Sequence, residues 1–520
     1  MSYRVVWFKR DLRWHDHAAL AQAAQGGPVL CLYILEPSLW RQPDAALQHL
    51  AFIRESLREL HRALRHQGGG VHLLVGEASE VLARLHAAAP FAELHSHEET
   101  GNAPSYERDK AVARWCRAQG VRWVEHRQFG VVRGLKDRNR WAGQWEAHMA
   151  VPQSLLQPLA FATAPCPADP WPAAASLGLN EYDPPARQRG GRPLGLAVLD
   201  EFLQERSGQY RGGISSPLSA PTACSRLSPY LSWGCLSLRE VVQATQETLL
   251  GIEGQDPGDR RRQQGLQAFL SRLHWHCHFI QKLESEPEIE WRNMHRGYDG
   301  LREASFHSAH FEALQAGRTG WPLVDACVAM LRHTGWLNFR MRAMLVSVAA
   351  YPLWLHWRPV GQWLATQFLD YEPGIHWSQM QMQSGTTGIN LTRVYNPIKQ
   401  AREHDPQGRF VRHWLPALRR VPDAWLFEPW RMPAELQARC GVKVGVDIAE
   451  PLVELSAATR QAKADLHARR QLSQVRAGVA EVIERHASRA NRHMVSDREP
   501  RPRRQQAAPP AQLGLSFSAD

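Results

Sequence analysis

The chain has 520 residues, well above the roughly 250–300 at which a single hydrophobic core stops growing, so a single small module is excluded and two or three packed units are expected. Charged residues make up 22% and hydrophobic residues 44%, and no stretch approaches the roughly 18 uninterrupted apolar residues of a membrane span, so no membrane segment is expected. The formal net charge of +11 favours a polyanionic partner.

Over the first 130 residues, short β-branched runs alternate with helical patterns. The predicted strands are 3–8, 28–35, 71–75, 92–95 and 121–125, and the predicted helices are 18–25, 44–67, 78–88 and 105–119. This alternation predicts an α/β domain over 1–130 with a parallel, Rossmann-like sheet. No G-x-G-x-x-G or G-x-x-x-x-G-K-[ST] follows a strand, so nucleotide binding cannot be inferred from this domain. Charges interrupt the first apolar run, and a cytoplasmic location is expected.

Three further regions follow along the chain. Residues 131–195 are rich in Pro, Ala and Gly and read as an inter-domain connection that packs against both domains. Helical spacing of apolar residues, clearest in 197–205, 266–283, 324–331 and 340–350, predicts a large all-α domain over 196–457. The segment 458–520 is a basic extension with 12 Lys and Arg against 6 Asp and Glu in 460–520; one or two helices and then disorder after about residue 494 are expected.

The eight cysteines are scattered with no C-x-x-C pair, which indicates reduced thiols and excludes a zinc ribbon. His274 and His278 have the spacing of a helical metal pair, but no third ligand lies nearby in the sequence, so no metal site is predicted. The 20 tryptophans against 10 tyrosines are unusual, although cores and clefts commonly hold tryptophan.

The most informative stretch is C-S-R-L-S-P-Y-L-S-W-G-C-L-S at 224–237. Its two early serines and the amides at a helix start suit phosphate binding, although an ordinary N-cap has the same pattern. The stretch resembles the FAD diphosphate-binding segment T-S-x-L-S-P-Y-L-x-x-G-x-L-S of the photolyase/cryptochrome family. Further motifs of that family match in order at 6–13 (V-W-F-K-R-D-L-R), 318–326 (R-T-G-W-P-L-V-D-A), 335–342 (G-W-L-N-F-R-M-R), 393–397 (R-V-Y-N-P) and 405–416 (D-P-Q-G-R-F-V-R-H-W-L-P).

The resemblance implies an enzyme that binds FAD in its helical domain, acts on UV-damaged DNA, flips a dimerised pyrimidine pair out of the duplex and splits it by light-driven electron donation from reduced FAD. Cyclobutane dimers are the favoured lesion, because the paired histidines that act on pyrimidine–pyrimidone photoproducts would fall on Phe339 and Ala343. A cryptochrome-type blue-light photoreceptor without repair and non-catalytic single-strand binding remain alternatives. A monomer is expected.

The resemblance also assigns roles residue by residue. Arg342 is expected to pair with Asp370, and Trp275 to stack on the flipped lesion. His376 falls where a side chain faces the flavin N5, and Trp357, Met380 and Trp377 fall on or beside the electron route. The implied FAD-binding residues are Tyr210, Cys224, Ser225, Arg226, Leu227, Ser228, Phe269, Arg272, His276, Phe339, Arg342, Asp370, Tyr371 and Glu372. The implied DNA-binding residues are Trp275, Arg393, Lys399 and Arg412, although a core tryptophan and a solvated charged face would look the same.

Several positions depart from the family pattern. Arg272 stands where a glutamate touches the lesion, and His276 replaces an arginine, so the lesion stays open. His376 replaces the usual asparagine and is expected to titrate in the physiological range. Of the three tryptophans in the family's photoreduction route, only Trp357 is in place, because the other two positions fall on Met380 and near Ala304. Four other tryptophans offer a different route: Trp321, Trp354, Trp363 and Trp377.

Two peripheral features also remain open. At 97–102 the folate-contacting Asn-Glu pair of the family is not reproduced, so a second, antenna chromophore would be of unknown identity. At the tail, Q-L-G-L-S-F (512–517) resembles a sliding-clamp peptide, although it would also fit an ordinary terminus.

Overall fold

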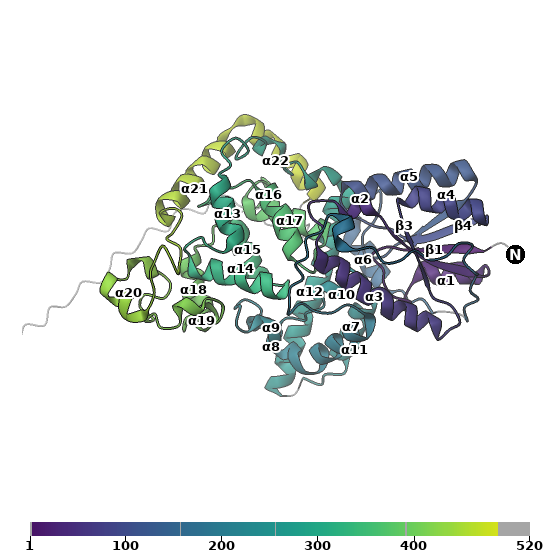
Figure 1. The fold of residues 1–520 in the computed structure, drawn as a ribbon, viewed down its shortest axis with the longest axis horizontal. Coiled ribbons are helices and arrows are strands. Elements are labelled where there is room, and N and C mark those ends of the chain that lie inside the picture. Colours follow the sequence, from purple (N-terminus) through teal and green to yellow (C-terminus); the bar gives the residue numbers. More distant parts are fainter. Residues whose placement is uncertain (1–2, 156–157, 255, 391–392, 487–520) are drawn as a thin grey trace, which may run out of the picture.

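The structure, a computed structural model, describes residues 3–155, 158–254, 256–390 and 393–486 (Figure 1). Five parallel strands form one sheet in the order β3-β2-β1-β4-β5, with bounds β1 Arg4–Phe8, β2 Val29–Leu35, β3 Val71–Val75, β4 Glu93–His97 and β5 Arg122–His126. The helices of this region are α1 Ala18–Gln25, α2 Pro37–Trp40, α3 Leu47–Arg65, α4 Ala78–Ala88 and α5 Ala103–Gln119. The predicted α/β fold is confirmed, and the bounds of α1, β3 and α4 are as predicted.

Both faces of the sheet are buried, as expected of a parallel sheet covered by crossover helices. Because side chains alternate along a strand, Val6 and Phe8 of β1 join the core cluster that contains residues of α1 and α3, whereas Val5 and Trp7 join the cluster that contains residues of α4 and α5. The carboxyl ends of the strands therefore form an edge from which the polar residues after β1, β2 and β4 project.

The connection at 131–195 packs against both halves of the molecule, as expected. Its backbone adds a bridge between Val29 and Phe161 beside β2, where the Val29 N–H donates to the Ala160 carbonyl (2.9 Å). Trp141 and Trp145 of α6 (Trp141–Ala150) belong to the same hydrophobic core as α1 and α3. The segment is thus a packed part of the core and not a free linker. The sequence-based domain boundaries themselves stay predictions.

The remainder of the described chain is helical, which confirms the predicted all-α part. The helices are α7 Arg192–Glu201, α8 Ser207–Gly213, α9 Ala220–Ala223, α10 Ser228–Ser232, α11 Leu238–Leu250, α12 Pro257–Ser285, α13 Ser308–Ala316, α14 Pro322–Thr334, α15 Phe339–Ala350, α16 Trp357–Gln367, α17 Pro373–Ser384, α18 Pro397–His404, α19 Arg409–Trp414 and α20 Ala434–Cys440. The 29-residue helix α12 begins where the Asp256 carboxylate accepts the amides of Gly258 and Asp259, with Pro257 in the first turn.

The T-G-W-P-x-x-D motif has a structural role at the start of α14. The Asp325 carboxylate accepts the Thr319 hydroxyl (2.7 Å) and the amides of Thr319 (2.8 Å) and Gly320 (3.1 Å). Pro322 then occupies the first turn, where a missing N–H costs nothing. The residues of this motif are therefore also explained by their structural role at the start of α14, apart from any resemblance to the family.

The two halves meet closely at Gly234, just after α10. Its φ of 65° is left-handed, and a Cβ there would lie 2.2 Å from the carbonyl oxygen of Arg10 in the α/β half. Only glycine satisfies both conditions without strain. The first loop of the α/β half is therefore held directly against the segment that carries the C-S-R-L-S motif.

Two helices close the described chain, α21 (Leu455–Gln471) and α22 (Ser473–His486), which confirms the predicted helices of the basic extension. Val482 of α22 packs in a small cluster with Leu283 and Ile289. The predicted disorder after about 494 and the clamp-like peptide at 512–517 lie outside the described residues. All eight cysteines are free thiols, as predicted. Among the described residues, no helix is long and apolar enough to cross a membrane.

Candidate flavin and DNA site

The C-S-R-L-S segment forms a tight turn between α9 and α10. Arg226 has a left-handed backbone (φ 63°), which is uncommon for a non-glycine residue and clusters at ligand sites. The Gln188 side-chain amide donates to the Arg226 carbonyl (3.0 Å), and the Arg206 guanidinium donates to the carbonyls of Thr222 and Cys224. The segment is thus held in place by Gln188 and Arg206, and its two serines, Ser225 and Ser228, are partly buried.

Arg226 itself carries a charge that the protein does not neutralise. Its Nε donates to the Gln188 amide oxygen (3.2 Å), and its guanidinium lies 3.9 Å from the ring centre of Trp336. Desolvation lowers its pKa to about 10. Within the described chain no carboxylate lies within ion-pair distance of it. An anion at this position would supply the missing partner, and a diphosphate has the right charge and acceptor oxygens.

Arg342 and the buried Asp370 form a two-pronged ion pair, as predicted. The guanidinium nitrogens lie 3.0 and 2.9 Å from the two carboxylate oxygens, and the Arg342 Nε donates to the Leu337 carbonyl (2.7 Å). The Asp370 pKa lies below its ordinary value because the Arg342 charge and hydrogen bonds, with one from Ser228, outweigh desolvation. The pair thereby ties α15 and the loop before α17 to the first residue of α10.

Tyr371 and Glu372 continue this loop and are both almost fully buried. The Tyr371 hydroxyl donates to the Asp44 carboxylate (2.7 Å), so this side chain turns toward the α/β half. Desolvation raises the Glu372 pKa to about 7 although the Arg10 guanidinium lies 3.4 Å away. The side chains of Asp370, Tyr371 and Glu372 therefore point to different parts of the molecule, and not all three can line a flavin.

His376 is buried, and its Nε2 lies 2.9 Å from the Gly361 carbonyl oxygen. Since a carbonyl only accepts, Nε2 carries the proton and Nδ1 is the free acceptor. Desolvation lowers the His376 pKa to about 4. The expectation that His376 titrates in the physiological range is therefore wrong, because burial keeps the ring neutral there.

The predicted residues of α12 separate into buried and exposed groups. Phe269 is buried against Phe202 and Tyr210, with ring centres 4.8 and 5.7 Å away, so Phe269 and Tyr210 support each other as one aromatic wall. Trp275 is 45% exposed, and the exposed Arg272 guanidinium lies 5.5 Å from its ring. This pair presents an aromatic face and a cation together.

Two further predicted FAD contacts behave differently from each other. His276 is turned toward the α/β side, edge-on to Phe129 at 5.0 Å, and desolvation lowers its pKa to about 4. Phe339, at the start of α15, is 57% exposed, and it is one of the most exposed large apolar side chains of the described chain. An exposed phenylalanine beside the Arg342–Asp370 pair would suit the edge of an aromatic cofactor.

The structure brings three of the predicted redox residues into one aromatic chain. The rings of Trp357 and Trp377 lie 5.9 Å apart, and the rings of Trp377 and His376 lie 5.0 Å apart. Met380 is buried in the same core cluster as both tryptophans. Trp354, by contrast, lies under the Arg302 guanidinium, and Trp363 lies against Phe311.

The predicted DNA-contacting cations are mostly paired. Arg393 is exposed. Lys399 lies 3.7 Å from the Glu403 carboxylate, and the Arg412 guanidinium lies 2.6 Å from that of Asp423. Exposed pairs of this kind contribute little to stability, so a phosphate could replace the carboxylate, but the net attraction is smaller than the sequence suggests.

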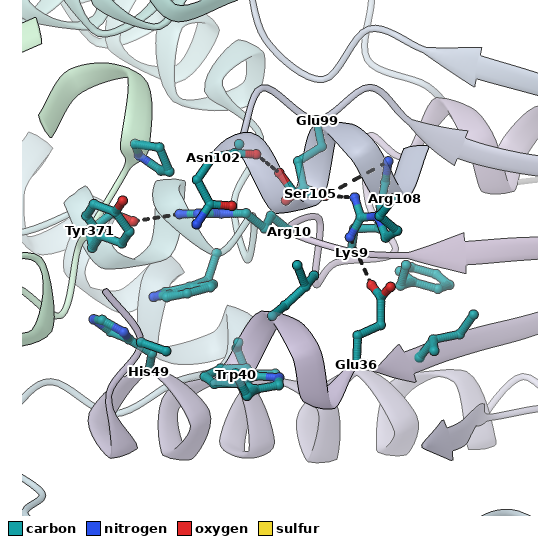
Figure 2. A pocket seen from close by; sticks show the side chains of 18 of the residues that line it. Lys9, Arg10, Glu36, Trp40, His49, Glu99, Asn102, Ser105, Arg108 and Tyr371 are labelled. Carbon is teal, nitrogen blue, oxygen red and sulfur yellow. Dashed lines mark hydrogen bonds and ion pairs between the residues drawn. The ribbon is translucent and has the colours of Figure 1, made fainter. Parts of the chain in front are cut away.

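Sequence reasoning missed a cavity of about 130 Å³ between the two halves (Figure 2). Its polar wall includes Lys9, Arg10, Asp44, Asn102 and Arg108, and Trp40 and Tyr371 supply aromatic surface. Only 97–102 pointed to this place. A second signal was available in the sequence: Lys9, Arg10 and Asn102 lie in the loops after β1 and β4, and ligands of parallel sheets bind beyond the carboxyl ends of the strands.

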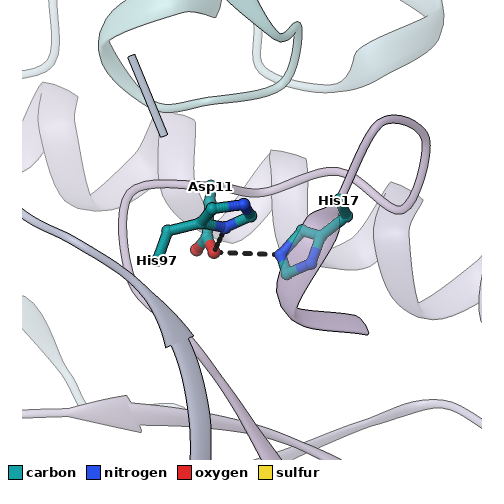
Figure 3. Close-up of side chains that lie close together, drawn as sticks. All are labelled: Asp11, His17 and His97. Atoms are coloured by element: carbon teal, nitrogen blue, oxygen red, sulfur yellow. Dashed lines mark hydrogen bonds and ion pairs between the residues drawn. The ribbon is translucent and has the colours of Figure 1, made fainter. Parts of the chain in front are cut away.

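A second missed feature is a buried group formed by Asp11, His17 and His97 (Figure 3). The Asp11 carboxylate lies 2.9 Å from His17 Nε2 and 2.7 Å from His97 Nδ1. The Leu20 amide donates to His17 Nδ1 (3.0 Å), so the proton of that ring is on Nε2, where a metal would have to bind. The contacts describe a satisfied hydrogen-bond network that fixes the first loop against α1.

Comparisons with known proteins agree with this arrangement. Residues 4–133 match the DNA photolyase family model, and residues 269–468 match the model of the FAD-binding domain of DNA photolyase. The chain is 29% identical to cryptochrome DASH of Gloeobacter violaceus, covering 88% of this chain and 95% of that protein. It is 28% identical to a deoxyribodipyrimidine photo-lyase of Streptomyces griseus, covering 88% and 98%.

Among solved structures, the archaeal photolyase of Sulfolobus tokodaii, determined with two FAD molecules, superposes with a TM-score of 0.71 at 22% identity, covering 89% of this chain and 99% of that one. The two family models and the motif order at 6–416 agree on one assignment. FAD is the implied cofactor, and the partly buried, unneutralised Arg226 fits its diphosphate. The chain belongs to the DNA photolyase/cryptochrome family.

Proposed function

We propose that this protein is a light-driven DNA repair enzyme that splits cyclobutane pyrimidine dimers with reduced FAD. The observation that carries the proposal is Trp275: a large aromatic ring, nearly half exposed, on the helix that also contributes Phe269 to the aromatic wall. An exposed indole with a neighbouring cation suits a base flipped out of a duplex, because bases stack on aromatic faces. When bound, FAD supplies the light-absorbing electron donor.

The chain's own residues would hold that cofactor at both ends. Arg226, the Ser225 hydroxyl and the amides at the start of α10 would bind the diphosphate, while the Ser228 hydroxyl donates to Asp370. The Arg342–Asp370 pair would place a fixed pair of charges near the ring system, and the buried His376 would offer it a neutral acceptor nitrogen. Phe339 would exclude water from one edge.

The direct test is repair of a defined substrate. Purified, reduced protein is illuminated with an oligonucleotide that carries one cyclobutane dimer, and restored bases are assayed, with a dark sample as control. Light-dependent restoration is expected. Bound flavin without restoration of this lesion would contradict the proposal. If pyrimidine–pyrimidone photoproducts are restored instead, the chemistry holds but the lesion is different.

The second candidate is a blue-light photoreceptor without repair, and one observation favours it. Arg272 lies beside Trp275 where repair enzymes are expected to place a glutamate. A guanidinium cannot give up a proton to a pyrimidine carbonyl, so it would stabilise the lesion only by its charge. Absence of repair of both lesions, with flavin bound and photoreduced, would favour the photoreceptor.

We expect Trp275→Ala to weaken binding of dimer-containing DNA by about 10–100-fold, because stacking on one base contributes ~1–3 kcal/mol. Affinity for undamaged duplex should change much less, since no base is flipped there. Fluorescence anisotropy with both duplexes measures the difference. The matched control is Trp291→Ala, another partly exposed tryptophan (37%) that lies outside the proposed site. Equal losses for both duplexes would show that Trp275 is only structural.

For the electron route, we expect Trp357→Phe and Trp377→Phe each to slow flavin photoreduction about tenfold, equivalent to ~1.4 kcal/mol in barrier. The reason is the contact chain from Trp357 through Trp377 to His376. Flavin absorbance under illumination with an external reductant gives the rate. Trp363→Phe, against Phe311, is the control. An unchanged rate in Trp377→Phe would place the route elsewhere.

The cavity between the two halves (Figure 2) is our candidate for the second, antenna chromophore. It combines aromatic surface from Trp40 and Tyr371 with both charged donors and acceptors, which suits a planar, polar ring system. Mass spectrometry of the small molecules that the purified protein releases on denaturation would identify this chromophore.

A further inference from the structure

One side chain of the α/β half reaches into the flavin-lining loop. Arg10, in the loop after β1, donates from its guanidinium to the Tyr371 carbonyl (2.6 Å; dashed in Figure 2) and to the Ser232 carbonyl at the end of α10 (3.1 Å). It also lies 3.4 Å from the Glu372 carboxylate and 4.5 Å from the ring centre of Trp233. Its donors thus join α10 and the 370–372 loop, the two segments implied to hold the two ends of FAD.

The position of Arg10 is itself fixed. The Gln128 side-chain amide donates to the Arg10 carbonyl, and that carbonyl lies against Gly234, where no side chain would fit. The Arg10 backbone is therefore held by residues of both halves, and its guanidinium is held by Ser232, Tyr371 and Glu372 of the helical half. A group ordered in this way loses little entropy when it makes its bonds.

Glu372 depends on this cation. The carboxyl is 5% exposed, and the Gly374 amide is its backbone donor. The charged groups that act on it are Arg10, which favours the ionised form, and Glu99, which opposes it. Desolvation, to which the Glu99 charge adds, outweighs Arg10 and raises the Glu372 pKa to about 7. Without Arg10, only the Gly374 amide among the groups named would offset desolvation.

We propose that Arg10 is a positioning residue for the flavin site, which holds the 370–372 loop in place and stabilises the charge of the Glu372 carboxylate. The inference deepens the proposed function and rests on it in one respect, namely that this loop lines the flavin. It makes the α/β half part of the flavin site and not only an antenna domain. In the family motif W-F-R-x-D-L-R at 7–13, Arg10 occupies the position that the pattern leaves variable.

The test measures the ionisation of Glu372 directly. Infrared titration of the protein as purified should show a carboxylic-acid band, identified by its loss in Glu372→Gln, with a midpoint near pH 7. In Arg10→Gln the midpoint should move up by about one unit or more, because an opposite charge within ~4–6 Å shifts a carboxyl by ~1–3 units. FAD affinity at pH 7 should fall about tenfold, which corresponds to ~1.4 kcal/mol.

Arg10→Lys separates charge from positioning. Lysine keeps the cation but loses the planar donors to the Ser232 and Tyr371 carbonyls. The Glu372 titration midpoint should therefore stay near pH 7 while FAD affinity still falls. Arg54→Gln is the control: it removes a cation of the same half that lies over Trp171, and it should move neither quantity. An unchanged Glu372 midpoint in a folded Arg10→Gln variant would overturn the proposal.

This outcome is distinct from failure of the proposed function. Loss of repair with a shifted Glu372 midpoint would refute DNA repair and leave the role of Arg10 standing. Normal repair with an unshifted midpoint would do the reverse.

Discussion

Arg342→Met is expected to lower the free energy of unfolding by about 3–5 kcal/mol, because it leaves the Asp370 carboxylate buried without its counter-ion. Asp370 is 9% exposed and takes both of its strongest hydrogen bonds from Arg342. Methionine fills similar volume, so the loss reports the charge more than a cavity. Urea unfolding followed by circular dichroism measures it. Adding Asp370→Asn to the variant should recover part of the loss, since the stranded charge is removed.

Lys399→Met is the matched control, because it removes a cation from an exposed pair with Glu403. A change of no more than ~0.5–1 kcal/mol is expected there. Equal losses in the two variants would contradict the assignment of Arg342–Asp370 as a buried structural pair.

The same pair sets an expected pH dependence. Because the Asp370 pKa is depressed in the folded state, its contribution to stability is present above the unfolded value of ~3.9 and is lost as pH falls through the folded value. In Arg342→Met, desolvation of the Asp370 carboxylate is opposed only by the smaller effects of the Ser228 and backbone hydrogen bonds, so the folded-state pKa of Asp370 should rise above its unfolded value and acidification should stabilise the variant. The stability gap between parent and variant should therefore narrow toward acid pH, and a constant gap would contradict the argument.

The sequence predicted most of the architecture because the responsible signals are local. The alternation of apolar runs locates the strands, and apolar residues at helical spacing locate parts of α12 (266–283) and α14 (324–331), although α12 begins nine residues earlier, at Pro257. The Arg342–Asp370 pair was also predictable, but only through the family motifs, since 28 residues separate its members.

The remaining features depend on which segments meet in space. The Arg10 contact with Glu372 joins residues 362 positions apart, and no pattern in either segment indicates it. The ionisation of His376 was predicted wrongly for a related reason: the histidine type suggests titration near neutrality, whereas burial decides its pKa. Likewise, the partners that occupy Lys399 and Arg412 are visible only once the chain is folded.

Arg226→Met should have the opposite signature to Arg342→Met. The guanidinium has one amide and one indole ring as partners, so its removal relieves a desolvated charge and should leave the stability of the flavin-free protein unchanged or raise it slightly. FAD affinity should fall about 10–100-fold, because a hydrogen bond to a charged group contributes ~1.5–3 kcal/mol. Flavin fluorescence titration and urea unfolding of flavin-free protein give the two quantities.

Arg211→Met is the control, since Arg211 also bonds to a glutamine amide, that of Gln264 (2.9 Å), but lies exposed and away from the turn. It should change neither quantity. If Arg226→Met destabilised the flavin-free protein as strongly as Arg342→Met, Arg226 would be a structural residue and the diphosphate assignment would fail. The chain places one neutralised and one unneutralised arginine at the two ends of the proposed flavin site, and only the second requires a ligand to complete it.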